Sequence, residues 1–310
     1  LSAPLLLENW YWFWPSSLEA PPDWHGDRTI GTILGSQQAV WLEESGYSIA
    51  LQVTGLTQLV RLMQAGRIEG VLADKEQFEA VLRQLDIPAD SFQFRFSRYV
   101  PLGVYFNQNS MRRLPDFLER FNQAIPACVP DGFFLPEDER QRIEALVVPV
   151  LRQWAVLPEL LTTVRDQNSD TVLLDRLEIG RQDAAWQDDV RAKRVPRRDH
   201  VLHRPLSRQL RALKAQAQPW ANEVIVMDRQ GLNIGISDLT SDYWQGDEPK
   251  FTEVFGQAAD RVFVDQVQYD LSTRKFQVQV SVPLVDALGE ALGALTVGVD
   301  VEQALSESIR

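Results

Sequence analysis

The chain has 310 residues and a formal net charge of −12 at pH 7, with 31 lysines and arginines against 43 aspartates and glutamates. This acidic balance disfavours a general nucleic-acid-binding protein, because neutralising phosphates requires a basic surface. The single cysteine, Cys128, excludes intramolecular disulfides, zinc fingers and iron–sulfur sites. The length favours two domains, each large enough to bury its own core.

The N-terminal end carries no signal peptide, and no apolar run approaches the roughly 20 residues of a membrane span. The first residue is Leu1 rather than methionine. We therefore expect an N-terminal piece, including an export signal, to precede this sequence.

Between residues 28 and 127, short β-rich runs alternate with runs of helical periodicity. The pattern predicts helices at residues 37–45, 57–66, 76–85 and 115–124, and strands at residues 29–34, 49–53, 68–73, 92–96 and 102–106. Such alternation is typical of a mostly parallel sheet covered on both faces, which is the α/β class. Ahead of it lies a hinge-like stretch, residues 5–14, whose aromatic side chains either stack on a ligand or pack in the core; packing is favoured.

Residues 129–136 hold two prolines and a glycine, which makes them the best candidate for a domain boundary. Beyond it, the sequence predicts helices at residues 137–161, 165–190 and 206–217, followed by strands at residues 224–228, 232–237, 261–269, 275–283 and 291–300. A long helix followed by an antiparallel meander belongs to the α+β class. We therefore expect an α/β domain at residues 1–131 and an α+β domain at residues 136–310.

A first candidate binding site follows the first of these α/β strands, where Gly35 and Ser36 precede a helix. Backbone N–H groups at a helix N-terminus favour an anion. These two residues therefore either hold a carboxylate or form an ordinary N-cap.

Two longer stretches give this half a family resemblance. Residues 64–74 read Gln-Ala-Gly-Arg-Ile-Glu-Gly-Val-Leu-Ala-Asp, and residues 101–106 read Pro-Leu-Gly-Val-Tyr-Phe. This order of helix, Gly-Arg, strand, Ala-Asp and return strand resembles the second lobe of extracellular solute-binding proteins of the amino-acid (family 3) type. The resemblance implies that Ser36 donates hydrogen bonds to a ligand carboxylate and that Asp74 holds the ligand ammonium group. The family's first lobe, with its arginine, has no counterpart here, and we expect it to be missing.

The second half carries a different resemblance. A strand at residues 223–228 ends in Met-Asp, and a turn leads to Gly-Leu-Asn at residues 231–233. Residues 241–248 read Ser-Asp-Tyr-Trp-Gln-Gly-Asp-Glu, and residues 293–298 read Gly-Ala-Leu-Thr-Val-Gly. Together with Trp186 at the end of a long helix, these segments resemble Cache domains of the PDC type, which are PAS-like extracytoplasmic sensor modules of bacteria. The resemblance implies a non-catalytic domain that binds a small molecule.

Residues 240–250 concentrate the groups that a small-molecule pocket uses: three acids, one lysine, one glutamine and two aromatic rings. The rings of Tyr243 and Trp244 would form walls. Asp242 and Asp247 would bind an ammonium group, and Lys250 would bind a carboxylate. The alternative is that the acids form turns and helix caps and that Trp244 plugs the sheet. The full candidate set is Asp228, Asn233, Ser237, Asp238, Asp242, Tyr243, Trp244, Gln245, Asp247 and Lys250. Asp228 and Asn233 also suit a turn between strands.

Other features favour less specific explanations. Residues 191–214 carry nine lysines and arginines, which suit an acidic partner or lipid headgroups, but a solvated face is the simpler explanation. His200 and His203 lack a carboxylate or thiol at metal-ligand spacing. No nucleophile elbow, P-loop, dinucleotide fingerprint or His-Glu-x-x-His occurs, and the spacing of Asp242 and Asp247 does not establish a glycosidase pair.

We therefore predict a bacterial, periplasmic protein that binds a small polar or amino-acid-like ligand for signal transduction or solute recognition, without catalysis and without a cofactor. A signalling or transport protein is the expected partner, and the long helix after residue 136 is the candidate surface for dimerisation. The alternative is a periplasmic accessory protein whose pocket is vestigial.

Overall fold

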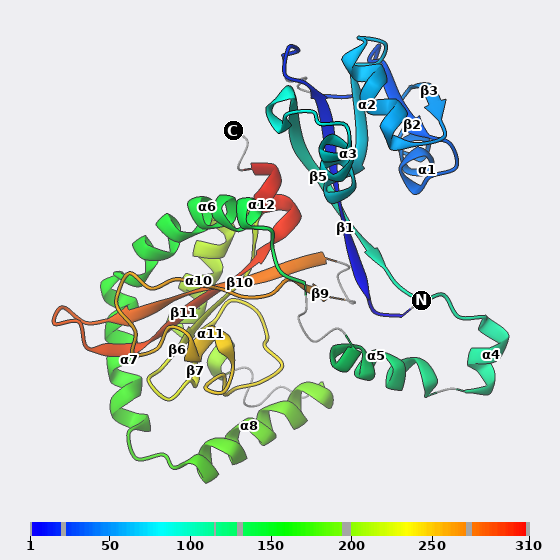
Figure 1. The fold of residues 1–310 in the computed structure, drawn as a ribbon. Helices are drawn as coiled ribbons and strands as arrows, with labels where there is room; N and C mark the ends of the chain where they lie inside the picture. The colour runs from blue at the N-terminus through cyan, green and yellow to red at the C-terminus, as the bar shows by residue number, and fades with distance from the viewer. Residues whose placement is uncertain are drawn as a thin grey trace. The chain divides into compact units, whose positions relative to one another are not determined.

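The computed structural model describes residues 2–19, 23–114, 116–128, 133–193, 200–270 and 275–307. The chain divides into two compact units, Leu1–Ile125 and Pro126–Arg310, which we call unit 1 and unit 2. Each unit contains its own β-sheet (Figure 1). Of the boundary predicted at residues 129–136, residues 129–132 lie outside the described residues.

Unit 1 is built on a five-stranded sheet in the order β3-β2-β4-β1-β5. Its strands are β1 (Leu6–Pro15), β2 (Ile30–Ile33), β3 (Ile49–Val53), β4 (Gly70–Asp74) and β5 (Phe92–Leu102). β2 pairs in parallel with β3 and β4, whereas β1 pairs antiparallel with β4 and β5. The mixed α/β character is confirmed, but the sheet is only half parallel because the stretch interpreted as a hinge forms β1 in its interior.

Four helices of unit 1 lie where the periodicity predicts them, whereas a short helix at residues 108–113 has no predicted counterpart. The helices are α1 (Gln37–Glu44), α2 (Leu56–Gln64) and α3 (Lys75–Gln84) between the strands, a 3-10 turn η1 (Ala89–Ser91), and α4 (Gln108–Arg113) and α5 (Phe117–Cys128) after β5. The strand predicted at residues 102–106 is wrong, because β5 ends at residue 102. Beyond that point the backbone of Val104 bonds to Ser2 rather than to a strand: Ser2 N–H donates to the Val104 carbonyl at 3.0 Å.

Strand β1 supplies the aromatic core of unit 1. Successive side chains of a strand point to opposite faces, so Trp12 and Phe13 pack on different sides of the sheet. Trp12 stacks on Trp24 with ring centroids 4.8 Å apart, and Phe13 stacks on Phe78 with centroids 3.8 Å apart. All five residues from 10 to 14 are at most 4% exposed. Packing, rather than stacking on a ligand, therefore explains these aromatics.

Unit 2 begins with the helices α6 (Glu137–Ala155), α7 (Pro158–Thr171), α8 (Arg176–Arg191) and α10 (Pro205–Gln216). The single helix predicted at residues 137–161 is wrong, because the chain bends by 66° between α6 and α7. Pro158 opens α7, where a proline is tolerated, and its ring disfavours helical backbone at the preceding Leu157, which is extended with ψ at 124°. Within the described residues no single helix is long and apolar enough to cross a membrane, although the bent pair α6 and α7 together meets the criteria of length and composition.

The sheet of unit 2 is antiparallel throughout its described pairs. Its strands are β6 (Ala221–Met227), β7 (Asn233–Ile236), β8 (Phe263–Val264), β9 (Gln268–Asp270), β10 (Lys275–Val285) and β11 (Ala291–Asp300). The order is β7-β6-β11-β10-β8, with β9 also pairing to β10. The predicted meander is therefore wrong in one respect: the last strand, β11, inserts between β6 and β10. The strand predicted at residues 261–269 is divided into β8 and β9.

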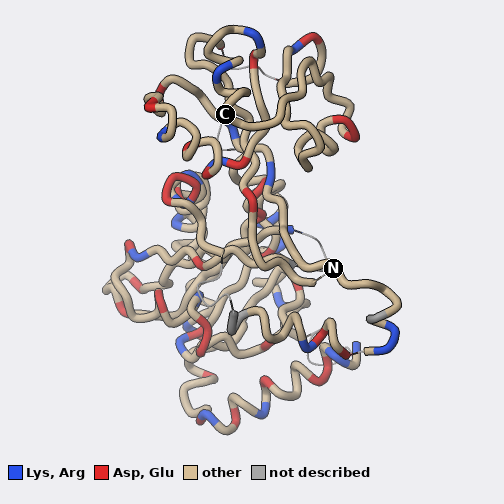
Figure 2. The backbone as a smooth tube through the Cα atoms, turned by 45° about the vertical axis from the view of Figure 1, so that its right-hand side comes forward, with Lys and Arg blue, Asp and Glu red and all other residues tan. Residues whose placement is uncertain are grey.

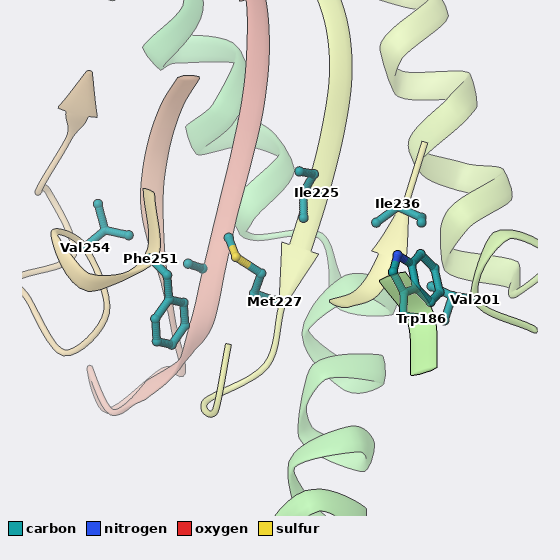
Figure 3. Packing of buried hydrophobic residues seen from close by; sticks show 8 residues of the cluster. Trp186, Val201, Ile225, Met227, Ile236, Phe251 and Val254 are labelled. Carbon is teal, nitrogen blue, oxygen red and sulfur yellow. The ribbon is translucent and has the colours of Figure 1, made fainter. Parts of the chain in front are cut away.

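Helices cover this sheet, and a buried cluster attaches the remaining chain to it. α6 packs on β10, α7 on β11, and α10 on β6 and β7. The cluster brings together Trp186 of α8, Ile225 and Met227 of β6, Ile236 of β7 and Phe251 of α11 (Pro249–Thr252) (Figure 3). A last helix, α12 (Val301–Glu307), follows β11 and packs on α6. The cluster thus fixes α8 and α11 against the face of β6 to which residues 223, 225 and 227 point.

Candidate functional site

A cavity of about 530 Å³ lies in unit 2 and is lined by residues of β6, β9 and β10 and by residues 239–250. We call residues 239–250 the wall segment. The volume lies in the range of small-molecule sites. The lining is mostly polar and consists of Glu223, Ile225, Leu239, Thr240, Ser241, Asp242, Gln245, Glu248, Lys250, Gln268, Tyr269, Gln277 and Gln279.

The strand register brings polar side chains of the sheet into this cavity. Glu223 of β6 pairs with Gly298 of β11, and Gly298 pairs with Gln279 of β10. Because Gly298 has no side chain, the other two meet across it, and Gln279 Nε2 lies 3.3 Å from Glu223 Oε1. Gln277, two residues earlier on β10, places its Nε2 3.4 Å from the same oxygen. The sheet therefore presents one carboxyl group flanked by two amides.

The charged groups that line the cavity are three carboxyls and one lysine. Lys250 is 5% exposed, and its Nζ lies 2.8 Å from Glu248 Oε2. Glu223 makes no ion pair with any residue that the structure describes. Burial raises the pKa of Glu223, and the nearby charge of Lys250 opposes that rise. The cavity thus contains one closed ion pair and two carboxyl groups, those of Glu223 and Asp242, that form no ion pair with a described residue.

Helix α8 holds the wall segment in place. Trp186 Nε1 donates to the carbonyl of Thr240 at 3.0 Å, and Gln187 Nε2 donates to Asp242 Oδ1 at 2.8 Å. Asp183 Oδ1 accepts the backbone N–H groups of residues 243 and 244 at 2.8 and 3.0 Å. Three side chains from consecutive turns of one helix therefore anchor a segment that lies more than 50 residues away in the sequence.

Three of the predicted site residues, Asp242, Gln245 and Lys250, line the cavity. Tyr243 and Trp244 were predicted as its walls, but neither belongs to the lining that the structure describes. The Tyr243 ring stacks on Trp186 with centroids 5.5 Å apart, so it belongs to the buried cluster.

Trp244 and Asp247 also point to roles outside the cavity. Trp244 Nε1 donates to the carbonyl of Gln230 at 2.7 Å, and its backbone forms a β-bridge with Leu232. The Trp244 ring therefore covers the turn between β6 and β7. This structural role is similar to the alternative from the sequence, in which Trp244 plugs the sheet. Asp247 is exposed and is absent from the described lining.

Asp228 and Asn233 shape the turn between β6 and β7. Asp228 is fully buried, and its Oδ1 accepts the N–H groups of Gln230 and Leu232, both at 2.9 Å. Burial raises the pKa of Asp228, and these hydrogen bonds oppose the rise. Asn233 Nδ2 donates to Thr240 Oγ1 at 3.0 Å, which ties β7 to the wall segment. Neither residue lines the cavity within the described lining.

Ser237 and Asp238 bind neighbouring elements rather than the cavity. Ser237 Oγ accepts the N–H of Val224 at 2.7 Å, which continues the pairing of β6 beyond the end of β7. Asp238 Oδ2 lies 2.6 Å from Lys214 Nζ of α10. Both residues therefore fasten the chain just before the wall segment.

In unit 1, Ser36 and Asp74 are helix N-caps. Ser36 Oγ accepts the N–H of Ala39 at 3.1 Å, and Asp74 Oδ1 accepts the N–H of Gln77 at 3.0 Å. Asp74 Oδ2 also accepts the N–H of Asn9 at 3.0 Å. Both carboxylate oxygens of Asp74 thus already accept backbone hydrogen bonds, and the ordinary N-cap is the role that the structure gives Ser36.

A smaller cavity of about 330 Å³ borders Ser36. Trp10, Trp41 and Arg98 are among its lining, and the Arg98 guanidinium lies 5.5 Å from the centroid of the Trp41 ring. Asp74 does not belong to the described lining, so the two residues that the resemblance assigns to one ligand do not share this cavity.

Sequence reasoning missed the six lining residues of the larger cavity that lie outside residues 228–250: Glu223, Ile225, Gln268, Tyr269, Gln277 and Gln279. A signal for two of them was present, because residues 275–281 alternate polar and apolar side chains along one strand. Glu223 gave no such signal, since it stands alone at the start of an apolar strand. Its position became informative only when the register placed it beside Gly298.

The remaining charged features do not form a site among the described residues. Acidic and basic residues are interspersed along the tube in Figure 2. Of the basic run at residues 191–214, residues 194–199 lie outside the described residues. Two of the others, Arg208 and Arg211, donate to backbone carbonyls at 2.7 and 2.9 Å. No group of three histidine, cysteine or acidic side chains suited to a metal ion occurs in the described part of the chain.

Comparison with known proteins found partial structural similarity only. No family model matches the chain. No curated protein matches it. An ancestral arginine-binding protein bound to glutamine aligns at 16% identity with a TM-score of 0.31, over 41% of this chain and 56% of that one. The GluR0 ligand-binding core from Nostoc punctiforme in complex with L-glutamate aligns at 18% identity with a TM-score of 0.31, over 40% and 56%.

A third structure is the substrate-binding protein of an ABC uptake transporter from Streptococcus pneumoniae with bound histidine. It aligns at 15% identity with a TM-score of 0.31, over 40% of this chain and 54% of that chain. The chain thus spans about half the length of these amino-acid-binding proteins. A TM-score of 0.31 carries no conclusion about what this chain binds.

Proposed function

We propose that the cavity of unit 2 binds a small polar molecule and that the protein acts by binding rather than by catalysis. The observation that carries this proposal is the set of buried polar side chains that face the cavity. Lys250, Gln245, Gln279 and Thr240 are each less than 10% exposed and yet line an open volume of about 530 Å³. Each of these side chains has a hydrogen-bond or ion-pair partner within the protein, so the polar lining is held in place without a ligand. A small polar molecule with matching groups would add hydrogen bonds to this lining.

The sensor role predicted from sequence remains part of this proposal. A ligand that prefers one arrangement of the wall segment would shift the population toward it. Helix α8, which holds the wall segment through Trp186 and Gln187, would be the first element to respond. The same proposal includes the Cache-type assignment of unit 2 and the solute-binding character of unit 1 with Ser36 and Asp74. It also includes the periplasmic location, a signalling or transport partner and dimerisation through α6.

The test compares the full chain with a variant whose cavity is filled. Leu239 lines the cavity and is 40% exposed, so Leu239→Trp can place an indole in the open volume without displacing the buried core. Leu288, 88% exposed and outside the described lining, provides the same substitution as a control in Leu288→Trp. Native mass spectrometry of freshly purified protein would then detect a retained small molecule, and a thermal-shift screen with the twenty L-amino acids would detect added ones.

We expect bound mass or ligand-induced stabilisation in the parent chain and in Leu288→Trp, and neither in Leu239→Trp. A hundredfold excess over the dissociation constant corresponds to about 2.7 kcal/mol of stabilisation, which a thermal shift resolves readily. Equal behaviour of all three proteins would reject the cavity as the binding site and favour an accessory protein. Fractionation of cells that carry the full-length gene tests the location, and purely cytoplasmic protein would reject that part of the proposal.

A further inference from the structure

We propose that the cavity of unit 2 selects ligands that carry an ammonium group and that the Glu223 carboxylate is the counter-charge that receives it. This inference rests on the proposed binding function and names the class of ligand. It makes Glu223, a residue of β6 outside the wall segment, the specificity-determining group.

The position of Glu223 is built into the sheet. Its side chain crosses directly over Gly298, and a Cβ added at that glycine would lie only 2.5 Å from Glu223 Cγ. No larger residue fits there without moving the carboxyl group. The amides of Gln277 and Gln279 then approach one carboxylate oxygen at 3.4 and 3.3 Å, which are long hydrogen bonds that hold the group without neutralising it.

The other carboxyls of the cavity are already satisfied. Glu248 pairs with Lys250 at 2.8 Å. Asp242 accepts hydrogen bonds from Gln187 at 2.8 Å and from Ser241 at 2.5 Å. Three carboxyls therefore face one lysine, and that lysine is already paired with one of them, Glu248.

The charge balance decides the sign of the ligand. An anionic group would meet three carboxyls and would have to displace Glu248 from Lys250. An ammonium group would instead pair with Glu223, whose hydrogen bonds from the two amides are long and reach only one of its oxygens. A charge pair formed in such a site is strengthened because less water screens it. The glutamines and Tyr269 leave hydrogen-bonding positions for polar groups on the rest of the ligand.

Binding should therefore depend on pH. The charged groups that act on Glu223 are Lys250 of α11, Lys214 of α10 and Asp238 after β7, and burial outweighs them in raising its pKa. Together with Asp242 and Glu248 in the lining, they define the field that the carboxyl group experiences. An ammonium ligand binds the ionised form, so affinity should rise as the pH increases through the raised pKa, with release of up to one proton.

The experiment uses four probes with the same four-carbon chain: 1,4-diaminobutane, 4-aminobutyrate, 1,4-butanediol and succinate. Isothermal titration of the full chain at pH 8 measures each affinity. We expect at least one of the two amines to bind, the diol to bind much more weakly and succinate not to bind. Glu223→Gln, which keeps the shape and removes the charge, should weaken the amine by roughly thirtyfold or more. Asp247→Asn removes an exposed charge next to the cavity and should leave the affinity within about twofold.

A second readout is the pH dependence of binding, and its wild-type part does not depend on whether a variant folds. The affinity of wild-type protein for the binding amine should fall between pH 8 and pH 5, and the Glu223→Gln variant should lose this dependence. Equal binding of the diol or succinate, an unaffected Glu223→Gln variant or a flat pH profile would each overturn the ammonium inference. If Leu239→Trp abolishes that binding of diol or succinate, the proposed binding function still holds. Failure of all four probes also overturns the inference, while native mass spectrometry decides the binding function separately.

Discussion

The close approach of Gly231 to the wall segment makes a quantitative prediction. Gly231 lies in the turn between β6 and β7 with φ at +82°, and a Cβ added there would lie 2.6 Å from the backbone nitrogen of Gly246. The Gly231 carbonyl also accepts the N–H of Gln245 at 2.8 Å. The perturbation is therefore Gly231→Ala, which adds one methyl group between two backbones that have no flexible side chain to yield.

Two costs add at this position. A non-glycine residue in the left-handed region costs about 1–2 kcal/mol. Forcing an extra carbon into a filled space costs typically about 1–3 kcal/mol. We therefore expect Gly231→Ala to lower the free energy of unfolding of unit 2 by about 2–5 kcal/mol. Gly256→Ala is the matched control, because Gly256 has φ at +73° and no atom within 4 Å of its added Cβ, so only the first cost applies.

The assay is hydrogen–deuterium exchange with mass spectrometry, because peptides from unit 1 and unit 2 report their opening free energies separately. Peptides from residues 221–250 should exchange faster in Gly231→Ala than in Gly256→Ala, by a factor that corresponds to the second cost. Peptides of unit 1 should not change in either variant. Equal effects of the two substitutions would show that residues 245 and 246 of the wall segment do not contact the turn at Gly231. The position of the wall segment beside the cavity would then be wrong.

Two further predictions concern the caps and the protonation of the cavity. Ser36→Ala and Asp74→Ala should each destabilise unit 1 by about 1 kcal/mol through the lost N-cap, and the loss should be larger for Asp74 because it also accepts the N–H of Asn9. Hydrogen exchange of unit 1 peptides measures this loss, and unchanged exchange would contradict the cap roles. The pKa of Glu223 is raised in the folded state above its ordinary 4.5, so the folded chain keeps a proton that the unfolded chain releases. The stability of wild type relative to Glu223→Gln should therefore be highest below the unfolded pKa and decline as pH rises through the raised pKa, and a constant difference in urea unfolding from pH 4 to 8 would disprove it.

Local sequence pattern was sufficient to predict many of the helices and strands of this chain. The helix at residues 37–44 and the buried strand at residues 70–74 follow from periodicity and capping residues, which act between near neighbours. The same is true of the long strand β10, whose alternation at residues 275–282 is visible in the sequence. The aromatic run at residues 10–14 was interpreted as a hinge, because a strand that is buried on both faces shows no alternation of polar and apolar residues.

The composition of the cavity depended on the tertiary structure. The sequence determined that residues 240–250 carry ligand-type groups, and Asp242, Gln245 and Lys250 do line the cavity. It did not determine that Tyr243 turns toward Trp186, since that contact joins α8 to the wall segment over more than 50 residues. Nor did it place Glu223 beside Gln279, because that pair requires β11 to insert between β6 and β10 with a glycine at the crossing point. Strand order and register are set by the packing of the whole unit, so residues that share a strand face can be predicted locally, whereas residues that share a cavity cannot.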